Sequence, residues 1–111
     1  MLRLGEQAAE AIRDLNHRTR GQDAFADPTE LCCLLADLNA TAYRLPQLLS
    51  QLDVWLSHEH AHARVRTDNS THPDALVAAA SAALTDAAGY AHRLAAALDT
   101  THQHAAHLAT A

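Results

Sequence analysis

Lysine is absent from this chain of 111 residues, and glycine, proline and aromatic residues are scarce. The eight basic residues are therefore all arginines, and they form no run along the chain. Nucleic-acid binders usually carry a basic patch, whereas the net charge here is −5, so we expect no nucleic-acid partner. Three glycines and three prolines are too few for a loop-rich or all-β domain.

Long hydrophobic runs are missing too. A transmembrane helix needs roughly 18 consecutive apolar residues, and no such run occurs, so we expect no membrane partner. The N-terminus, MLRLGEQAAEAIRDL, lacks the apolar stretch of a signal peptide. The only cysteines, Cys32 and Cys33, are adjacent, which disfavours a disulfide between them, and free thiols fit a reducing compartment. We therefore expect a cytoplasmic protein.

Alanine and leucine dominate the apolar 49% of the chain, and both are strong helix formers. We expect one all-α domain over residues 1–111, with helices at about 2–18, 28–65 and 73–108. Asp27 is the expected N-cap of the second helix, with Pro28 at its first position. Pro46 lies inside that helix and should either kink it or break it near Leu45 into two helices joined by a tight turn. We favour the kink, because the apolar pattern keeps its phase across the proline.

Apolar residues recur on one stripe of each expected helix. In the first helix the stripe is Leu4, Ala8, Ala11, Ile12 and Leu15. In the second it is Leu31, Leu35, Leu38, Ala42, Leu45, Leu49, Leu52 and Leu56. In the third it is Val77, Ala80, Leu84, Ala87, Ala91, Leu94, Leu98, Thr101, Ala105 and Leu108. The two longer stripes alternate steps of three and four, which is the pattern of a coiled-coil seam.

These stripes predict an antiparallel hairpin of two long helices with the shorter first helix packed against it, a three-helix bundle. Three further residues, Leu34, Leu48 and Trp55, widen the second stripe along one flank. The first helix is too short to cover the whole hairpin, so part of this flank stays uncovered. An uncovered apolar flank usually meets a partner, and we expect a homodimer or another helical protein there.

Nine histidines raise the question of metal binding. His58 and His62 are four residues apart and can face one zinc ion from a single helical turn, although the run HEHAH is not the HExxH motif of metalloproteases. At the other end of the hairpin, His17, Cys33 (or Cys32), His104 and His107 could converge on zinc if both helix registers hold. The alternative for the first pair is solvated surface histidines. For the second set it is a cysteine that packs and histidines near a frayed end.

No catalytic constellation accompanies these residues. The serines lie in no nucleophile elbow, no glycine-rich phosphate loop is present, and Asp37, Asp53, Asp86 and Asp99 all fall off the apolar stripes. We therefore expect a non-catalytic protein with no required cofactor.

Two resemblances add to this interpretation. Trp55-Leu56-Ser57 stands near the middle of a helical hairpin of about 100 residues, which resembles the secreted WXG100 family and would imply a secreted helical hairpin. The chain departs from that family because position 57 is serine rather than glycine and Tyr90 is followed four residues later by Leu94. The composition is also similar in style to small Ala/Leu/His-rich hypothetical helical proteins of Streptomyces-type actinobacteria.

The sequence thus favours a helical protein–protein interaction or self-assembly module. The alternatives are a metal-binding or metal-sensing protein that uses histidine and cysteine, and a WXG100-like secreted hairpin.

Overall fold

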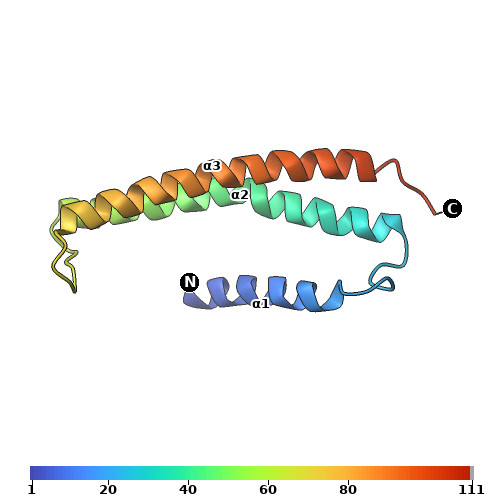
Figure 1. Ribbon diagram of the computed structural model, residues 1–111, viewed down its shortest axis with the longest axis horizontal. Coiled ribbons are helices and arrows are strands. Elements are labelled where there is room, and N and C mark those ends of the chain that lie inside the picture. The colour runs from blue at the N-terminus through green and yellow to red at the C-terminus, as the bar shows by residue number, and fades with distance from the viewer. Residues whose placement is uncertain (111) are drawn as a thin grey trace.

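The structure is a computed structural model that describes residues 1–110, and within that range it contains helices and no strand. The helices follow in the order α1 (Leu2–Arg18), α2 (Pro28–Ala61) and α3 (Pro73–Ala105). Figure 1 shows α2 and α3 side by side as an antiparallel hairpin, with α1 running alongside the first part of α2. The all-α, three-helix architecture expected from the sequence is confirmed.

Helix α2 begins as its sequence predicts. Asp27 adopts an extended backbone and its side chain accepts a hydrogen bond from the Glu30 amide at 3.0 Å. The Glu30 carboxylate in turn accepts one from the Ala26 amide at 3.1 Å, so two amides near the helix start are satisfied. Pro28 occupies the first helical position, where its missing N–H costs nothing.

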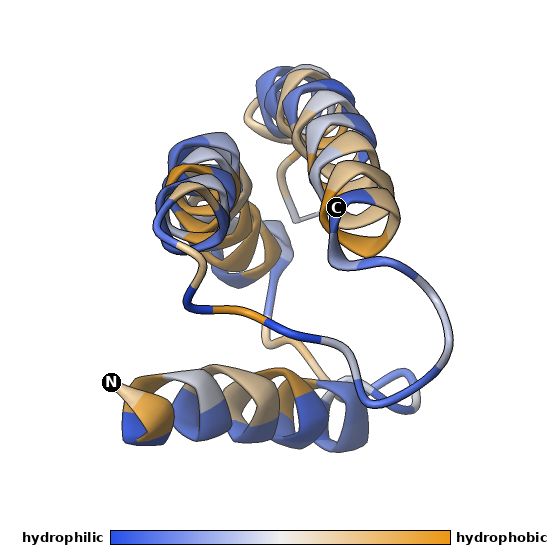
Figure 2. Ribbon diagram, turned by 90° about the vertical axis from the view of Figure 1, so that its left-hand side faces the viewer, coloured by the Kyte–Doolittle hydropathy of each residue, from blue (hydrophilic) through white to orange (hydrophobic). Residues whose placement is uncertain are grey.

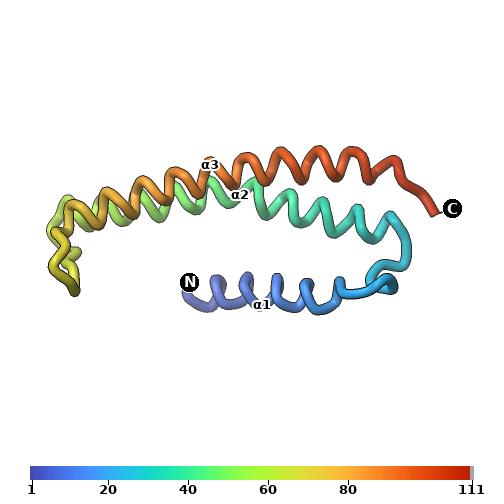
Figure 3. The backbone as a smooth tube through the Cα atoms, viewed as in Figure 1, coloured from blue at the N-terminus to red at the C-terminus, as the bar shows by residue number. Residues whose placement is uncertain are grey.

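Helix α2 also runs on through Pro46, whose ring is buried. A proline inside a helix removes one backbone hydrogen bond and pushes against the preceding turn, which bends the helix axis. Figure 3 shows a bend in the middle third of α2. On the N-terminal side of this bend, α2 diverges from α3. The expected single helix is therefore found, and it is bent rather than broken.

The C-terminal end of α2 comes at Ala61, four residues before the expected position 65. Ala63 adopts a positive φ of 56°, which stops the helix. The Arg64 amide then donates to the Glu59 carbonyl at 2.9 Å and the Ala63 amide to the His60 carbonyl at 3.0 Å. This pair of bonds is a Schellman motif, here closed by alanine where glycine is the usual residue. Helix α3 likewise ends three residues before the expected position 108.

The hairpin is held by a thin core and by two polar contacts between its helices. The buried side chains among the described residues are three alanines, Ala42, Ala91 and Ala105, and Pro46. Near the turn, His60 Nε2 lies 2.7 Å from the Asp74 carboxylate. Towards the open end, the Asn39 amide donates to the Asp99 carboxylate at 3.4 Å. Small residues at the centre let α2 and α3 approach closely, and larger side chains line the seam without being enclosed.

Helix α1 does not dock on this hairpin, contrary to the expected packing. No Cα atom of α1 lies within 8 Å of a Cα atom of α2 or α3. Its apolar side chains remain largely in solvent, with Leu4 and Ile12 exposed and Leu15 half-buried. A connector of nine residues, 19–27, joins α1 to α2.

Candidate interface on one face of the hairpin

The seam between α2 and α3 is shifted by one position from the stripe that the sequence indicates. On α3 the residues turned toward α2 include Val77, Leu84, Ala91, Leu98 and Ala105, as expected. Between them, however, the inward positions are the half-buried Ser81, Ala88, Ala95 and His102. The expected Ala80, Leu94 and Thr101 are exposed, whereas the expected Ala87 is half-buried, as is Ala88.

The same shift occurs in the second half of α2. Leu52 is 47% exposed, whereas Asp53 is half-buried and its Oδ1 is enclosed without a hydrogen-bond partner in the described part of the chain. The expectation that Asp53 falls off the stripe is therefore wrong. The shift is already present on the N-terminal side of Pro46, because Asn39 contacts Asp99 across the hairpin and Pro46 itself is buried.

This shift gathers the apolar residues that were expected in the seam onto one side of the hairpin. In an antiparallel helix pair, the positions that immediately precede the seam residues lie on the same side of both helices. We define the apolar face by these positions and by the apolar residues beside them. On α2 they are Leu31, Leu34, Leu38, Leu45, Leu48, Leu52 and Trp55. On α3 they are Leu76, Ala80, Ala83, Ala87, Tyr90, Leu94 and Ala97.

None of these residues is charged, and the largest of them are open to solvent. Charges border the set: Glu59 occupies the next such position on α2, and the Arg93 guanidinium lies 4.7 Å from the ring centroid of Tyr90. Leu48 is 50% exposed and Trp55 is 62% exposed, so the flank expected to be uncovered is uncovered in its distal half, near the turn. Leu34, the third residue of that flank, is half-buried. The opposite face carries mostly polar or small residues: Gln47, Ser50, Ser57, Ala82, Thr85, Gly89, His92, Asp99 and Gln103. Tyr43 and Val54 are its two large apolar residues, and they are 79% and 66% exposed. The hairpin is therefore a single amphipathic layer.

The apolar sides of α1 and of the hairpin face one another across the molecule. Figure 2 looks along the hairpin and shows the hydrophobic ribbon of α1 turned toward the two long helices, with its hydrophilic side turned away. The two surfaces do not touch, because no Cα atoms come within 8 Å and Leu4, Ile12 and Leu48 all remain exposed. Two amphipathic units are thus present in one chain, and neither has its apolar side covered.

The total exposed area shows how much surface lacks a cover. The chain exposes 8808 Å², whereas a compact monomer of 11.9 kDa exposes about 5,900 Å². The radius of gyration, 18.8 Å, also exceeds the roughly 13 Å of a compact domain of this length. The excess of about 2,900 Å² is larger than one partner's share of a standard protein–protein interface.

A shallow groove continues the apolar face at the turn. It encloses about 280 Å³ and is lined by Leu56, Val65, Arg66, Thr67, Pro73, Leu76, Val77 and Ala80. Leu76 and Ala80 belong to both the groove and the apolar face. The lining has no group of acids, bases or nucleophiles, and the groove is better suited to an apolar side chain than to a reaction.

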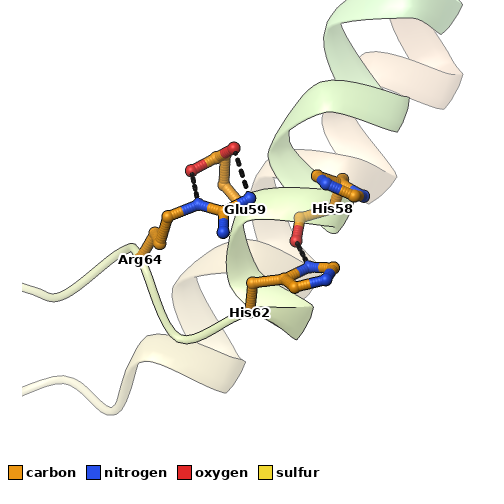
Figure 4. Close-up of polar contacts among 4 residues, drawn as sticks. All are labelled: His58, Glu59, His62 and Arg64. Carbon is orange, nitrogen blue, oxygen red and sulfur yellow. Dashed lines mark hydrogen bonds and ion pairs between the residues drawn. The ribbon is translucent and has the colours of Figure 1, made fainter.

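The structure brings His58 and His62 together. Their ring centroids are 4.3 Å apart, and His62 Nδ1 lies 2.8 Å from the His58 carbonyl oxygen, as Figure 4 shows. That contact leaves only Nε2 of His62 available to a metal. In residues 1–110 no three histidine, cysteine or acidic side chains lie close enough together to hold an ion. The pair thus offers at most half of a tetrahedral zinc site.

Beside this pair, the Arg64 guanidinium donates two hydrogen bonds to the Glu59 carboxylate, Nε to Oε2 at 2.6 Å and Nη2 to Oε1 at 3.0 Å (Figure 4). This hydrogen-bonded guanidinium holds the pKa of the Glu59 carboxyl below its ordinary value of 4.5. The same contact raises the pKa of Arg64. The ion pair links Arg64, the last residue of the Schellman motif, to Glu59 on α2, so it stabilises the end of the helix.

The second expected metal cluster is dispersed. His17 lies on α1, which does not contact the hairpin, and so it does not meet Cys33, His104 or His107. Cys33 is exposed and Cys32 half-buried, and both are free thiols. Cys32 lines a small pocket with Ala105 and Leu108 at the open end of the hairpin. That pocket contains no histidine, so the arrangement does not assemble a Cys/His ligand set.

None of the helices in residues 1–110 combines the length and apolarity needed to cross a bilayer. Comparison with known proteins gives no match, whether with a family model, a curated protein or a solved structure.

Proposed function

We propose that this protein is a non-catalytic helical interaction module that binds another protein through the apolar face of its hairpin. The observation that carries the proposal is the amphipathic layer itself: the uncharged side has no cover within the chain, and the chain exposes about 2,900 Å² more than a compact monomer does. This excess contains polar as well as apolar surface and includes helix α1. Its apolar part is unfavourable by about 25 cal/mol per Å², so covering that part favours association.

The distal half of the face has the composition of a binding hot spot. Trp55 is a large aromatic flanked by Leu48 and Leu52, and all three are about half-exposed or more. Aromatic anchors surrounded by aliphatic residues dominate the energy of protein interfaces. The adjoining groove at Leu76 offers a recess for a partner side chain. We place this interaction in the cytoplasm, where Cys32 and Cys33 stay reduced.

A photo-crosslinking experiment tests this proposal without assuming who the partner is. A photoreactive phenylalanine analogue replaces Leu48 on the apolar face, and in a second strain it replaces Val54, which is 66% exposed on the other side of α2. After irradiation of cells of the source organism, we expect a crosslinked species of higher mass from position 48 and none from position 54. Equal yields from both positions, or none from position 48, would contradict the proposal.

A further inference from the structure

We infer that the partner of the apolar face is a second copy of this chain, an inference that rests on the proposed function. The reason lies in the unequal side chains of the two helices. On the distal half of the face, α2 contributes a ridge of large residues, Leu48, Leu52 and Trp55. Beside it, α3 contributes a row of small ones, Ala80, Ala83 and Ala87.

A ridge next to a trough is complementary to itself under twofold symmetry. When two hairpins stack face to face about a twofold axis parallel to their helices, α2 of each copy lies over α3 of the other. Each leucine and tryptophan ridge then fills the alanine trough of the second copy, as an isologous interface requires. The product is an antiparallel four-helix bundle, which encloses the large side chains that the hairpin alone leaves open.

The exposed area agrees with this partner. Obligate dimers bury about 2,000–5,000 Å² in total, which is about 1,000–2,500 Å² from each copy. The excess of about 2,900 Å² per chain exceeds that share even though the exposed helix α1 accounts for part of it. The residues of the face are uncharged, and the charges nearest to it are Glu59 on α2 and Arg93, whose guanidinium lies 4.7 Å from the ring centroid of Tyr90. A second uncharged face of the same length therefore matches it at least as well as any charged surface does.

Helix α1 cannot take the place of the second copy. Its 17 residues extend about 25 Å, whereas the 34 residues of α2 extend about 50 Å. Docking α1 would cover at most half of the face and leave the rest open. Helix α1 stands on the same side of the hairpin (Figure 2), so a second copy that covers the whole face has to move α1 aside. No Cα atom of α1 lies within 8 Å of the hairpin, so this movement disrupts no close helix packing.

The test begins with the solution mass of the purified full-length chain by light scattering. We expect a dimer for the wild type and for Val54→Glu, and a monomer for Leu52→Glu and for Ala83→Glu. Leu52 and Ala83 are exposed in the single chain, so both variants should keep the helical circular dichroism of the wild type. A wild-type monomer, or a dimer that survives both face variants, would overturn the inference.

A cysteine pair then tests the arrangement of the two copies. In a background with Cys32→Ser and Cys33→Ser, chains carrying Leu52→Cys are mixed with chains carrying Ala83→Cys and oxidised mildly. We expect a disulfide-linked heterodimer from this mixture, and none when Val54→Cys replaces Leu52→Cys. A dimer by mass without the 52–83 bond overturns the placement of the ridge in the trough.

The two proposals fail in different ways. If the purified chain is a monomer while the probe at position 48 crosslinks in cells to a different protein, the second copy is overturned and the interaction module stands. If the chain is a monomer and position 48 crosslinks to nothing, both proposals are overturned.

Discussion

Asp53 is a polar residue at a position of α2 that faces α3. Its Oδ1 is enclosed at a seam position on α2 without a hydrogen-bond partner among the described residues. A buried oxygen that loses its water and gains no donor destabilises the fold by about 1–3 kcal/mol. Polar residues at single seam positions can fix the register of two helices at a cost in stability, and Asp53 has the location for that role.

We therefore predict that Asp53→Leu stabilises the protein by about 1–3 kcal/mol, because the leucine fills the seam without an unsatisfied oxygen. Asp37→Leu is the matched control, since Asp37 is exposed on the same helix. The free energy of unfolding from urea titration measures both. A loss of stability in the Asp53 variant would show that its carboxylate has a partner in the assembled protein.

The Glu59–Arg64 ion pair predicts a pH dependence. The pKa of Glu59 is lowered in the folded state, so the pair contributes stability above the ordinary value of 4.5 and loses it as the pH falls through the lowered pKa. Glu59→Gln should melt slightly below the wild type at about pH 7, and the difference should shrink toward zero at about pH 3. Thermal melts at the two pH values measure this. A difference that grows as the pH falls would contradict the assignment.

The C-terminal end of α2 lacks the usual sequence signal for a helix end. Helix ends are usually signalled by glycine at the left-handed position, and here Ala63 occupies it with a φ of 56°. The pattern therefore predicts a helix that continues to residue 65. The start of the same helix is marked by Asp27 and Pro28, and that prediction is confirmed to the residue.

Ala63→Gly should stabilise the protein by about 1 kcal/mol, because glycine adopts the left-handed conformation without the steric penalty of a Cβ atom. Ala61→Gly, within α2, is the control and should destabilise by a similar amount. Chemical denaturation compares the two variants with the wild type. If Ala63→Gly were the less stable of the pair, the Schellman geometry assigned to this end of the helix would be wrong.

The seam marks the limit of what periodicity can predict. On α3 one set of seam residues repeats every seven positions: Val77, Leu84, Ala91, Leu98 and Ala105. This set fits a seam whose remaining positions are 80, 87, 94 and 101, and it fits equally one whose remaining positions are 81, 88, 95 and 102. The intervening positions decide the matter, and alanine, serine and leucine are all compatible with a half-buried site. A broad apolar stripe therefore predicts the hairpin but cannot show which of its flanks points inward.

At the scale of the whole molecule, the missing contact between α1 and the hairpin is what sequence analysis did not foresee. The apolar stripe of α1 predicts that this helix packs against an apolar surface. The stripe does not show whether that surface belongs to the hairpin of the same chain or to another molecule. The candidate interface was predicted in part, since Leu48 and Trp55 are exposed as expected. Its extension across α3 depends on the shifted seam, and tertiary packing sets that shift.

Trp55 is the sole tryptophan and lies in the candidate interface, so its fluorescence tests most directly whether the apolar face is covered. At concentrations where the full-length protein is dimeric, we predict blue-shifted emission and weak quenching by acrylamide. Dilution below the dissociation constant, or Leu52→Glu, should restore a red-shifted and strongly quenched signal. Emission typical of solvent-exposed tryptophan at every concentration would show that the purified protein leaves this face open, and would contradict the account.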